Sequence, residues 1–409
     1  MAVREMLVPG TTAALLVIDV ADAPKLQVRL GFSESASLLR TLRAGLKDAV
    51  GSRGHVVPLE DGRFCAIVRM IRNRGHAVLA GEKLARTAQE LLDSQGMAFG
   101  PQVNVGIALY PSQTTDPEEL LRLAQLAAEA AQKRASRVVV YDDACQAEII
   151  APWALGNRFA QALDTGGLSV YYQPKICISS GQVIGVESLL RWFQHGTPVA
   201  TPDVFIPLAE ASGLIHATTW YCLSNSLRMS SELSGLPVAI NITPAMLHHR
   251  EFMDMIRTAV STWRIEPHKL TLEITEGALI ANFDVAAVRL NQLRNFGVVI
   301  AIDDFGTGYS SLSYFKKIPA DELKIDKSFI MNMASDSSDQ QLVRTIIGLA
   351  RHFNLEVVAE GVENRATFDA LAQMGCHQAQ GYLFSPALSL PRLKAWLAEN
   401  SRDLRAPAT

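Results

Sequence analysis

The feature that most constrains the fold is a regular alternation of short apolar runs with longer amphipathic stretches in the carboxyl-terminal part of the chain. Such an alternation is typical of parallel strands connected by helices. The number of runs, eight, favours an α/β barrel of eight strands. The runs are Leu168–Gln173, Val183–Arg191, Val238–Ile242, Leu270–Thr275, Val298–Asp303, Glu322–Asp326, Glu356–Glu360 and Cys376–Tyr382.

Each run carries a polar or ionisable residue at or near its carboxyl-terminal end, where a buried strand has no structural need for one. In a parallel barrel these ends meet at one face, and the active sites of such barrels lie there. We therefore predict that these residues surround a single site. In chain order they are Gln173, Glu187, Asn241, Glu273, Asp303 with Asp304, Lys324, Glu360 and Gln380.

The carboxylates in this set indicate a metal site. Clustered carboxylates raise one another's pKa unless positive charge compensates them. The set contains oxygen donors and no His or Cys, which favours Mg²⁺, Mn²⁺ or Ca²⁺ over Zn²⁺. The adjacent Asp303 and Asp304 would let one carboxylate bridge two ions, an arrangement typical of phosphoester cleavage by a metal-bound water. Lys324 is expected beside that water. A glycosidase with the same fold is an alternative, but it would need only a pair of acids, and the set here is larger.

The first 150 residues predict a smaller, mixed α/β domain, and we place the boundary near residue 150. Strands are expected over Ala13–Asp19, Phe64–Met70, Val103–Tyr110 and Val138–Tyr141. A helix is expected over Ser37–Val50. Asp116 followed by Pro117 is a typical helix start, with an N-cap and a proline at the first helical position.

The composition predicts a globular, cytoplasmic chain. Hydrophobic residues make up 48% and charged residues 19%, and the formal net charge is −3, which does not favour a nucleic-acid polymer as partner. No apolar stretch approaches the roughly 20 residues that span a bilayer, so no membrane association is expected. The five cysteines form no C-x-x-C pair, which argues against a disulfide framework or a structural zinc site. His248 and His249 are interpreted as a solvated loop pair.

Seven short motifs resemble, in order, those of EAL-domain cyclic di-GMP phosphodiesterases. The resemblance covers about residues 153–398, and Ser188 stands where the E-A-L signature has alanine. Several motifs in the correct order are far more specific than any one of them. The motifs are Glu187-Ser188-Leu189-Leu190-Arg191, Asn241-Ile242-Thr243, Leu272-Glu273-Ile274-Thr275-Glu276, Asp303-Asp304-Phe305-Gly306-Thr307-Gly308, Leu323-Lys324-Ile325-Asp326, Ala359-Glu360-Gly361-Val362-Glu363 and Gln380-Gly381-Tyr382.

The resemblance implies a modified (β/α)8, TIM-like barrel that hydrolyses cyclic di-GMP to linear pGpG with two Mg²⁺ or Mn²⁺ ions, and that Ca²⁺ would inhibit. It implies that Lys324 contacts the attacking water, that Arg191 binds a substrate phosphate, and that Glu276 braces the loop after Asp304. Gln173 and Gln380 would lie near the substrate. It assigns Glu187, Asn241, Glu273 and Asp303 to one ion, and Asp303, Asp304 and Glu360 to the other. A bacterial signalling role in biofilm formation and motility, a homodimer and a regulatory protein partner are family expectations.

The first half resembles a GGDEF domain, the cyclase fold that often precedes an EAL domain. Gly106-Ile107-Ala108-Leu109-Tyr110-Pro111 and the helix after Asp116 are similar to its later segments. The signature itself reads Glu60-Asp61-Gly62-Arg63-Phe64, without its glycines or its acidic pair. We therefore predict a degenerate, regulatory domain without cyclase activity. Because this half has lost catalytic residues, a catalytically silent cyclic di-GMP receptor acting through protein partners is the alternative for the whole chain.

Overall fold

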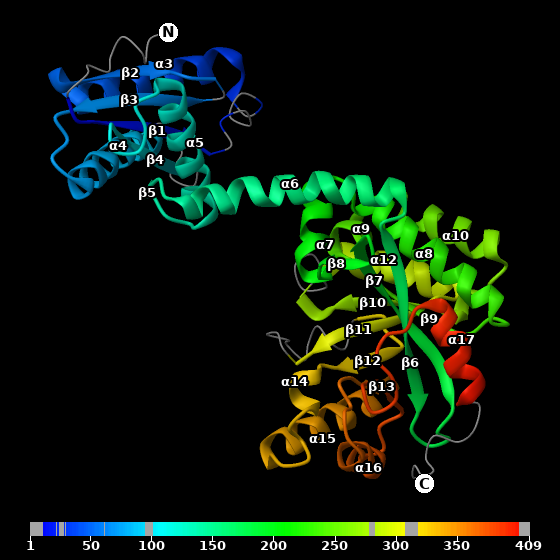
Figure 1. Ribbon diagram of the computed structural model, residues 1–409. Helices are drawn as coiled ribbons and strands as arrows, with labels where there is room; N and C mark the ends of the chain where they lie inside the picture. Colours follow the sequence, from blue (N-terminus) through cyan, green and yellow to red (C-terminus); the bar gives the residue numbers. More distant parts are fainter. Residues whose placement is uncertain are drawn as a thin grey trace. The chain divides into compact units, whose positions relative to one another are not determined.

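The computed structural model describes residues 11–400, except 22, 24–27, 29, 61, 95–100, 278–282 and 307–317. It divides into two compact units, Met1–Leu155 and Gly156–Thr409 (Figure 1). The division falls within helix α6 (Asp143–Thr165), a few residues beyond the boundary expected from the sequence. The joint between the units is therefore helical. Within the described residues, no helix is both long and apolar enough to cross a membrane.

The first unit is a five-stranded sheet in the order β2-β3-β1-β4-β5, antiparallel except for the β4–β5 pair. Three long helices accompany it: α3 (Phe32–Val50), α4 (Arg74–Ser94) and α5 (Pro117–Lys133). The strands are β1 (Ala13–Val20), β2 (Gly54–Pro58), β3 (Arg63–Arg69), β4 (Val103–Tyr110) and β5 (Val138–Val140), with a short 3-10 helix, η1 (Gly51–Arg53), before β2.

Strand β1 lies at the centre of this sheet and is apolar on both faces. Leu16 and Ile18 pack with apolar residues of α3 and α4, whereas Leu15 and Val17 pack with those of α5. Successive side chains of a strand point to opposite faces, so helices on both sides require a continuous apolar run. This is why the sequence predicts β1 so clearly. The expected cap is also present, since Asp116 Oδ1 accepts a hydrogen bond from the Glu118 N–H at 3.2 Å.

The second unit is a closed barrel of eight strands, as the sequence predicts. The sheet runs β6-β14-β13-β12-β11-β10-β9-β7, and an additional β6–β7 pairing closes it. Strand β8 (Thr197–Ala200) adds to β7 from outside the ring. The barrel strands are β6 (Leu168–Cys177), β7 (Val183–Gln194), β9 (Val238–Asn241), β10 (Leu270–Thr275), β11 (Val299–Phe305), β12 (Glu322–Ile325), β13 (Glu356–Ala359) and β14 (Gln378–Ala379).

Helices connect and surround these strands (Figure 1). A short 3-10 helix, η2 (Pro267–Lys269), precedes β10. The helices are α7 (Pro202–Ala211), α8 (Ile215–Glu232), α9 (Pro244–His248), α10 (Phe252–Trp263), α12 (Phe283–Phe296), α14 (Lys327–Ile330), α15 (Ser337–His352), α16 (Arg365–Met374) and α17 (Leu390–Glu399).

One strand departs from the parallel arrangement that the alternation predicts. Strand β6 runs antiparallel to both of its neighbours, β7 and β14. Only residues 178–182 separate β6 from β7, and a parallel connection needs a crossover of about a dozen residues or more. The two strands therefore form a hairpin. As a result, Gln173 and Glu187 lie within long strands, opposite one another, and not at strand ends.

The close approach of Gly381 to the backbone of Val362 generates a prediction about the fold at the barrel mouth. A Cβ at this glycine would lie 2.2 Å from the Val362 carbonyl oxygen and 2.3 Å from its nitrogen. We expect Gly381→Ala to destabilise the protein by about 1–3 kcal/mol, the usual effect of overpacking. The matched control is Gly348→Ala in α15, where a Cβ would meet nothing within 4 Å. This change should stabilise by about 0.5–1 kcal/mol. Urea unfolding of both variants tests the contrast, and equal effects would contradict it.

Candidate active site

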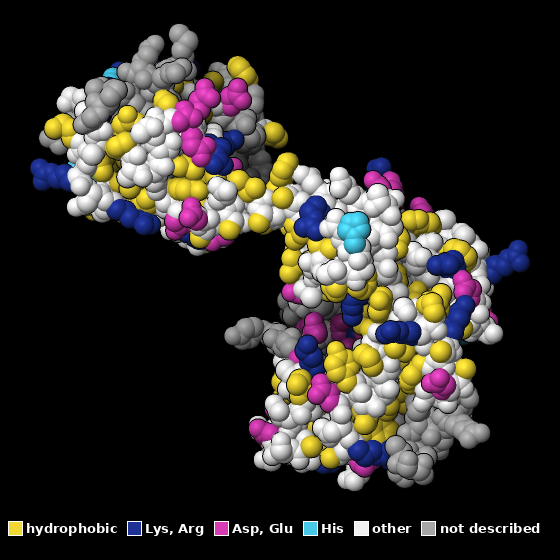
Figure 2. All heavy atoms as spheres, in the orientation of Figure 1, with side chains coloured by type: hydrophobic (Ala, Val, Ile, Leu, Met, Phe, Trp, Pro, Cys, Tyr) yellow, Lys and Arg dark blue, Asp and Glu magenta, His cyan; other side chains and the backbone are white. Residues whose placement is uncertain are grey.

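The parallel strands place most of the predicted residues at one end of the barrel. Asn241 on β9 lies beside Glu273 on β10, and Thr275 lies beside Asp303 on β11. The antiparallel hairpin brings Gln173 opposite Glu187 at the same level. Figure 2 shows acidic side chains gathered in a recess of the second unit.

Lys324 on β12 is the centre of this group. Its ammonium lies 2.7 Å from Glu360 Oε1, 2.9 Å from Glu273 Oε2 and 3.0 Å from Asp303 Oδ1. Glu187 Oε2 is further away, at 3.8 Å. The lysine is only 1% exposed. Four carboxylates from four different strands or strand ends therefore converge on one buried cation.

A second buried lysine, Lys175, was missed by the sequence analysis. Its Nζ lies 2.7 Å from Glu273 Oε1 and 3.8 Å from Glu322 Oε2. Lys175 stands two residues beyond Gln173 on β6, and residues two apart in a strand share a face. That spacing was the available signal for an inward-pointing lysine. Both oxygens of Glu273 are thus held by lysine ammonium groups.

The charges in the group shift its pKa values in opposite directions. Burial raises the pKa of Glu273, but Lys175 and Lys324 outweigh it and hold the pKa at about 2. Burial, followed by the charge of Glu273, raises the pKa of Glu187. Burial also raises the pKa of Glu360 to about 8, since Lys324 only partly offsets it and the charge of Asp303 adds to it. Two lysines are therefore too few cations for five carboxylates, and the excess negative charge fits divalent cations.

The backbone at Asp303 and Asp304 puts adjacent carboxylates on one side. Neighbouring strand residues normally point to opposite faces. Here the β11–β12 register shifts between Ile302 and Phe305, and Asp304 has a φ of 53°, in the left-handed region. Ligand oxygens of Asp303, Asp304 and Glu360 consequently all lie within 4.8 Å of one another. These three residues fit a Mg²⁺ or Mn²⁺ ion.

The other predicted ion set is arranged less tightly. Within the part of the chain that the structure describes, Glu187 and Glu273 belong to no group of three such ligand atoms. The ammonium of Lys324 contacts both carboxylates. Asn241 Nδ2 donates a hydrogen bond to Glu187 Oε1 at 2.8 Å. The assignment of Glu187, Asn241, Glu273 and Asp303 to one ion therefore stays a prediction.

The two glutamines form a chain of amides at the edge of the cluster. Gln380 Nε2 donates to Glu187 Oε2 at 2.6 Å and to Gln173 Oε1 at 2.9 Å. Gln173 Nε2 in turn donates to the Ser385 carbonyl at 3.1 Å. Gln380 Oε1 is buried without a hydrogen-bond partner among the described residues, so one acceptor at the edge of the cluster is left unsatisfied.

Arg191 and Glu276 lie around the cluster. Arg191 is on β7, four residues beyond Glu187 on the same strand face, roughly 13 Å further along. Its Nη1 donates to the Leu190 carbonyl at 2.9 Å, so the structure does not bring it to the carboxylates. Glu276 is buried, and its Oε2 accepts a hydrogen bond from the Gly306 N–H at 3.0 Å. Thr307 and Gly308, the last residues of the motif that begins at Asp303, lie outside the described residues.

Comparison with known families decides where the chain belongs. The family model described as EAL domain matches residues 157–387. The chain belongs to the EAL-domain family. A second model, described as diguanylate cyclase, GGDEF domain, matches residues 3–137. The resemblance found in the sequence is thereby confirmed for both domains.

Individual EAL-domain proteins are similar over nearly the whole chain. The bifunctional diguanylate cyclase/cyclic di-GMP phosphodiesterase MucR of Pseudomonas aeruginosa is 33% identical over 97% of this chain and 59% of its own length. The cyclic di-GMP phosphodiesterase NbdA of the same organism is 31% identical, over 97% and 52%. The chain thus spans somewhat more than half the length of these relatives. The solved structure titled PaMucR phosphodiesterase, c-di-GMP complex, is 40% identical over 58% of this chain and 98% of its own, with a TM-score of 0.56.

The raised pKa of Glu360 predicts a pH dependence for the metal-free protein. The folded state keeps a proton that the unfolded state releases above the ordinary value of 4.5, so stability is lost as the pH rises from 4.5 through about 8. The raised pKa of Glu187 acts in the same direction. Thermal unfolding in chelator should show a melting temperature that falls over this range. Glu360→Gln should flatten the decline, and saturating Mg²⁺ should oppose it. A melting temperature that is constant across this range in wild-type protein would contradict the excess of negative charge in the acidic cluster.

Proposed function

We propose that this EAL domain hydrolyses one phosphodiester of cyclic di-GMP to give linear pGpG. The observation that carries the proposal is the convergence of carboxylates from separate strands on buried Lys324, beside the close group of Asp303, Asp304 and Glu360. The 40% identity to a structure titled as a cyclic di-GMP complex supports the choice of substrate. In the reaction, water adds across one P–O bond, and the departing ribose oxygen takes up a proton.

The oxygen donors suit two Mg²⁺ or Mn²⁺ ions. When bound, such ions would supply positive charge that lowers the pKa of water and neutralises phosphate. One ion would be held by Glu187, Asn241, Glu273 and Asp303, and the other by Asp303, Asp304 and Glu360.

Lys324 contributes as a permanent cation and not as a base. The carboxylates around it outweigh the effect of burial and hold its pKa well above the usual value, so its ammonium keeps all its protons at neutral pH. An ammonium has only donors, so Lys324 can orient the lone pairs of a water and stabilise negative charge as the water attacks. Lys175 positions Glu273 from the opposite side.

The remaining predicted residues bind and orient the substrate. The Arg191 guanidinium would make paired hydrogen bonds to a substrate phosphate. Gln173 and Gln380 form the polar wall beside Glu187. Glu276 holds the backbone at Gly306 and so fixes the start of the loop that follows Asp304. A homodimer, a protein partner and inhibition by Ca²⁺ remain expectations from the family resemblance.

We propose that the GGDEF-like domain is regulatory and makes no cyclic di-GMP. Arg63, in the place of a signature acid, pairs directly with Asp19 across β1 and β3. Burial raises the pKa of Asp19, and the charge of Arg63 lowers it. A guanidinium at this position supplies the positive charge that metal ions would otherwise bring. The two residues line a cavity of about 670 Å³ that also includes Glu129, Lys133 and Trp153.

Turnover of cyclic di-GMP tests the proposed active site. Purified protein with Mg²⁺ or Mn²⁺ should form pGpG, resolved by chromatography, and a chelator should abolish this. Lys324→Met and Glu187→Ala should each lower kcat by about 100-fold or more, the effect of losing one electrostatic group at the reacting atoms. Lys394→Met, which removes an exposed lysine paired with Glu232, is the control and should keep full activity. Undiminished turnover in both site variants would exclude the site. Tight binding without product would favour the silent receptor.

Incubation with GTP tests the first domain. We expect no cyclic di-GMP from GTP and Mg²⁺ because Arg63 stands where the signature has an acid. Any effect of GTP on pGpG formation would indicate binding in the first domain and should be lost in Asp19→Asn. Formation of cyclic di-GMP by wild-type protein would show that the domain is an active cyclase.

A further inference from the structure

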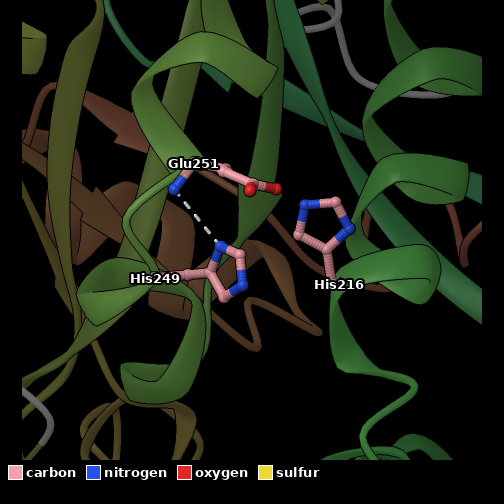
Figure 3. Close-up of side chains that lie close together, drawn as sticks. All are labelled: His216, His249 and Glu251. Atoms are coloured by element: carbon pink, nitrogen blue, oxygen red, sulfur yellow. Dashed lines mark hydrogen bonds between the residues drawn. The ribbon is translucent and has the colours of Figure 1, made fainter.

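A second group of potential metal ligands lies in the second unit, apart from the acidic cluster. It consists of His216 in the first turn of α8, His249 directly after α9, and Glu251 directly before α10. One ligand atom from each residue lies within 4.8 Å of the others. The two imidazole rings have their centroids 4.9 Å apart and are inclined by 48°. Figure 3 shows the Glu251 carboxylate extending toward the His216 ring.

The donor atoms of this group are held only weakly by the protein itself. Among the described residues, the His216 imidazole makes no hydrogen bond or ion pair, and its ring contact is with His249. His249 Nδ1 accepts a long hydrogen bond, 3.3 Å, from the Glu251 N–H (Figure 3). The Glu251 carboxylate has one ion pair, at 3.6 Å, to Arg250, which is 88% exposed. A metal ion that binds these donor atoms can therefore replace each of these contacts.

His216 and His249 are half-buried. The sequence suggested that His248 and His249 form a solvated loop pair, and for His249 this interpretation is wrong. His248 is exposed at the end of α9, but His249 turns inward against α8. The hydrogen bond from the Glu251 N–H leaves the proton of a neutral His249 ring on Nε2. The Nδ1 lone pair is the one that this ring would offer to a metal, so metal binding would replace the 3.3 Å hydrogen bond from the Glu251 N–H.

We propose that His216, His249 and Glu251 bind a divalent transition-metal ion of the Zn²⁺ class. Two imidazoles and one carboxylate are a ligand set that Zn²⁺ accepts, with a fourth position open to water. Ideal tetrahedral ligands lie about 3.3 Å apart at Zn–N and Zn–O distances near 2 Å, so the three ligand atoms, which lie within 4.8 Å of one another, would move closer together on binding. Binding of Mg²⁺ is disfavoured at a site with imidazole ligands and favoured in the all-oxygen cluster around Lys324. The chain would thus hold two kinds of metal at two places.

Occupancy of this site would cross-link two segments of the barrel wall. His216 is the second residue of α8, whereas His249 and Glu251 belong to the connection between α9 and α10. That connection follows β9 and Asn241, with Thr243 capping α9. Because a metal that binds only the folded state stabilises it by mass action, Zn²⁺ should raise the melting temperature.

Calorimetric titration of the full chain with ZnCl₂, in excess Mg²⁺ to occupy the oxygen ligands, tests the proposal. Wild-type protein should bind one Zn²⁺ that His216→Ala and His249→Ala bind at least tenfold more weakly, because even the loss of an outer-shell partner costs metal sites roughly 10- to 100-fold. Glu251→Gln should also weaken binding. His248→Ala, which removes the adjacent exposed histidine, is the matched control and should bind as wild type does.

A separate thermal unfolding of each variant in Mg²⁺ alone shows whether it is folded. Glu251 is 56% exposed at its side chain, so Glu251→Gln keeps the test decisive if a histidine variant fails to fold. Zn²⁺ should raise the melting temperature of wild-type protein and of His248→Ala, and raise that of Glu251→Gln less. Equal Zn²⁺ affinity and stoichiometry in wild type, His216→Ala and Glu251→Gln would overturn the proposal, as would the absence of Zn²⁺ binding to wild type in excess Mg²⁺.

Discussion

The buried ammonium of Lys324 is the contact on which the rest of the barrel mouth depends. Carboxylates on neighbouring strands repel one another, and burial makes each ionised group costly. Lys324 draws Glu273, Asp303 and Glu360 to within 3.0 Å of a single atom, and Lys175 holds the other oxygen of Glu273. Losing one partner of such a buried network typically costs about 3–5 kcal/mol. The lysines therefore hold an acidic cluster together, and the remaining negative charge is what the proposed divalent cations would neutralise.

Much of the fold and of the candidate site could be predicted because the barrel brings residues that recur at strand ends along the sequence to one face of the fold. Each parallel strand ends at the same face, so polar residues at run ends converge without knowledge of any contact. The prediction failed where the path of the chain departs from that rule. Strand β6 runs the other way because its connection to β7 is too short for a helix. The short connection is visible in the sequence, but every apolar run was interpreted as a parallel strand.

Three features of the structure were not predicted from the sequence. Asp303 and Asp304 share a side only because of a left-handed residue and a register shift, and neither follows from residue type. Lys175 was missed because a lysine next to a proline in an apolar run gives no obvious motif. His216 and His249 meet across different helices, so no local pattern links them. The meeting of the two histidines requires the packing of distant segments, which a single sequence does not specify.

The reversed direction of β6 also decides where the chain enters the barrel. In a fully parallel barrel, the first strand would start at the face opposite the acidic cluster. Here β6 starts at the face that carries this cluster, and its second residue, Ser169, pairs with Arg191. Helix α6 ends at Thr165, only a few residues earlier. The residues that follow α6 therefore reach the barrel at the end where the acidic cluster lies, and the strand pair β6–β7 brings this entry segment beside Arg191, the residue proposed to bind phosphate.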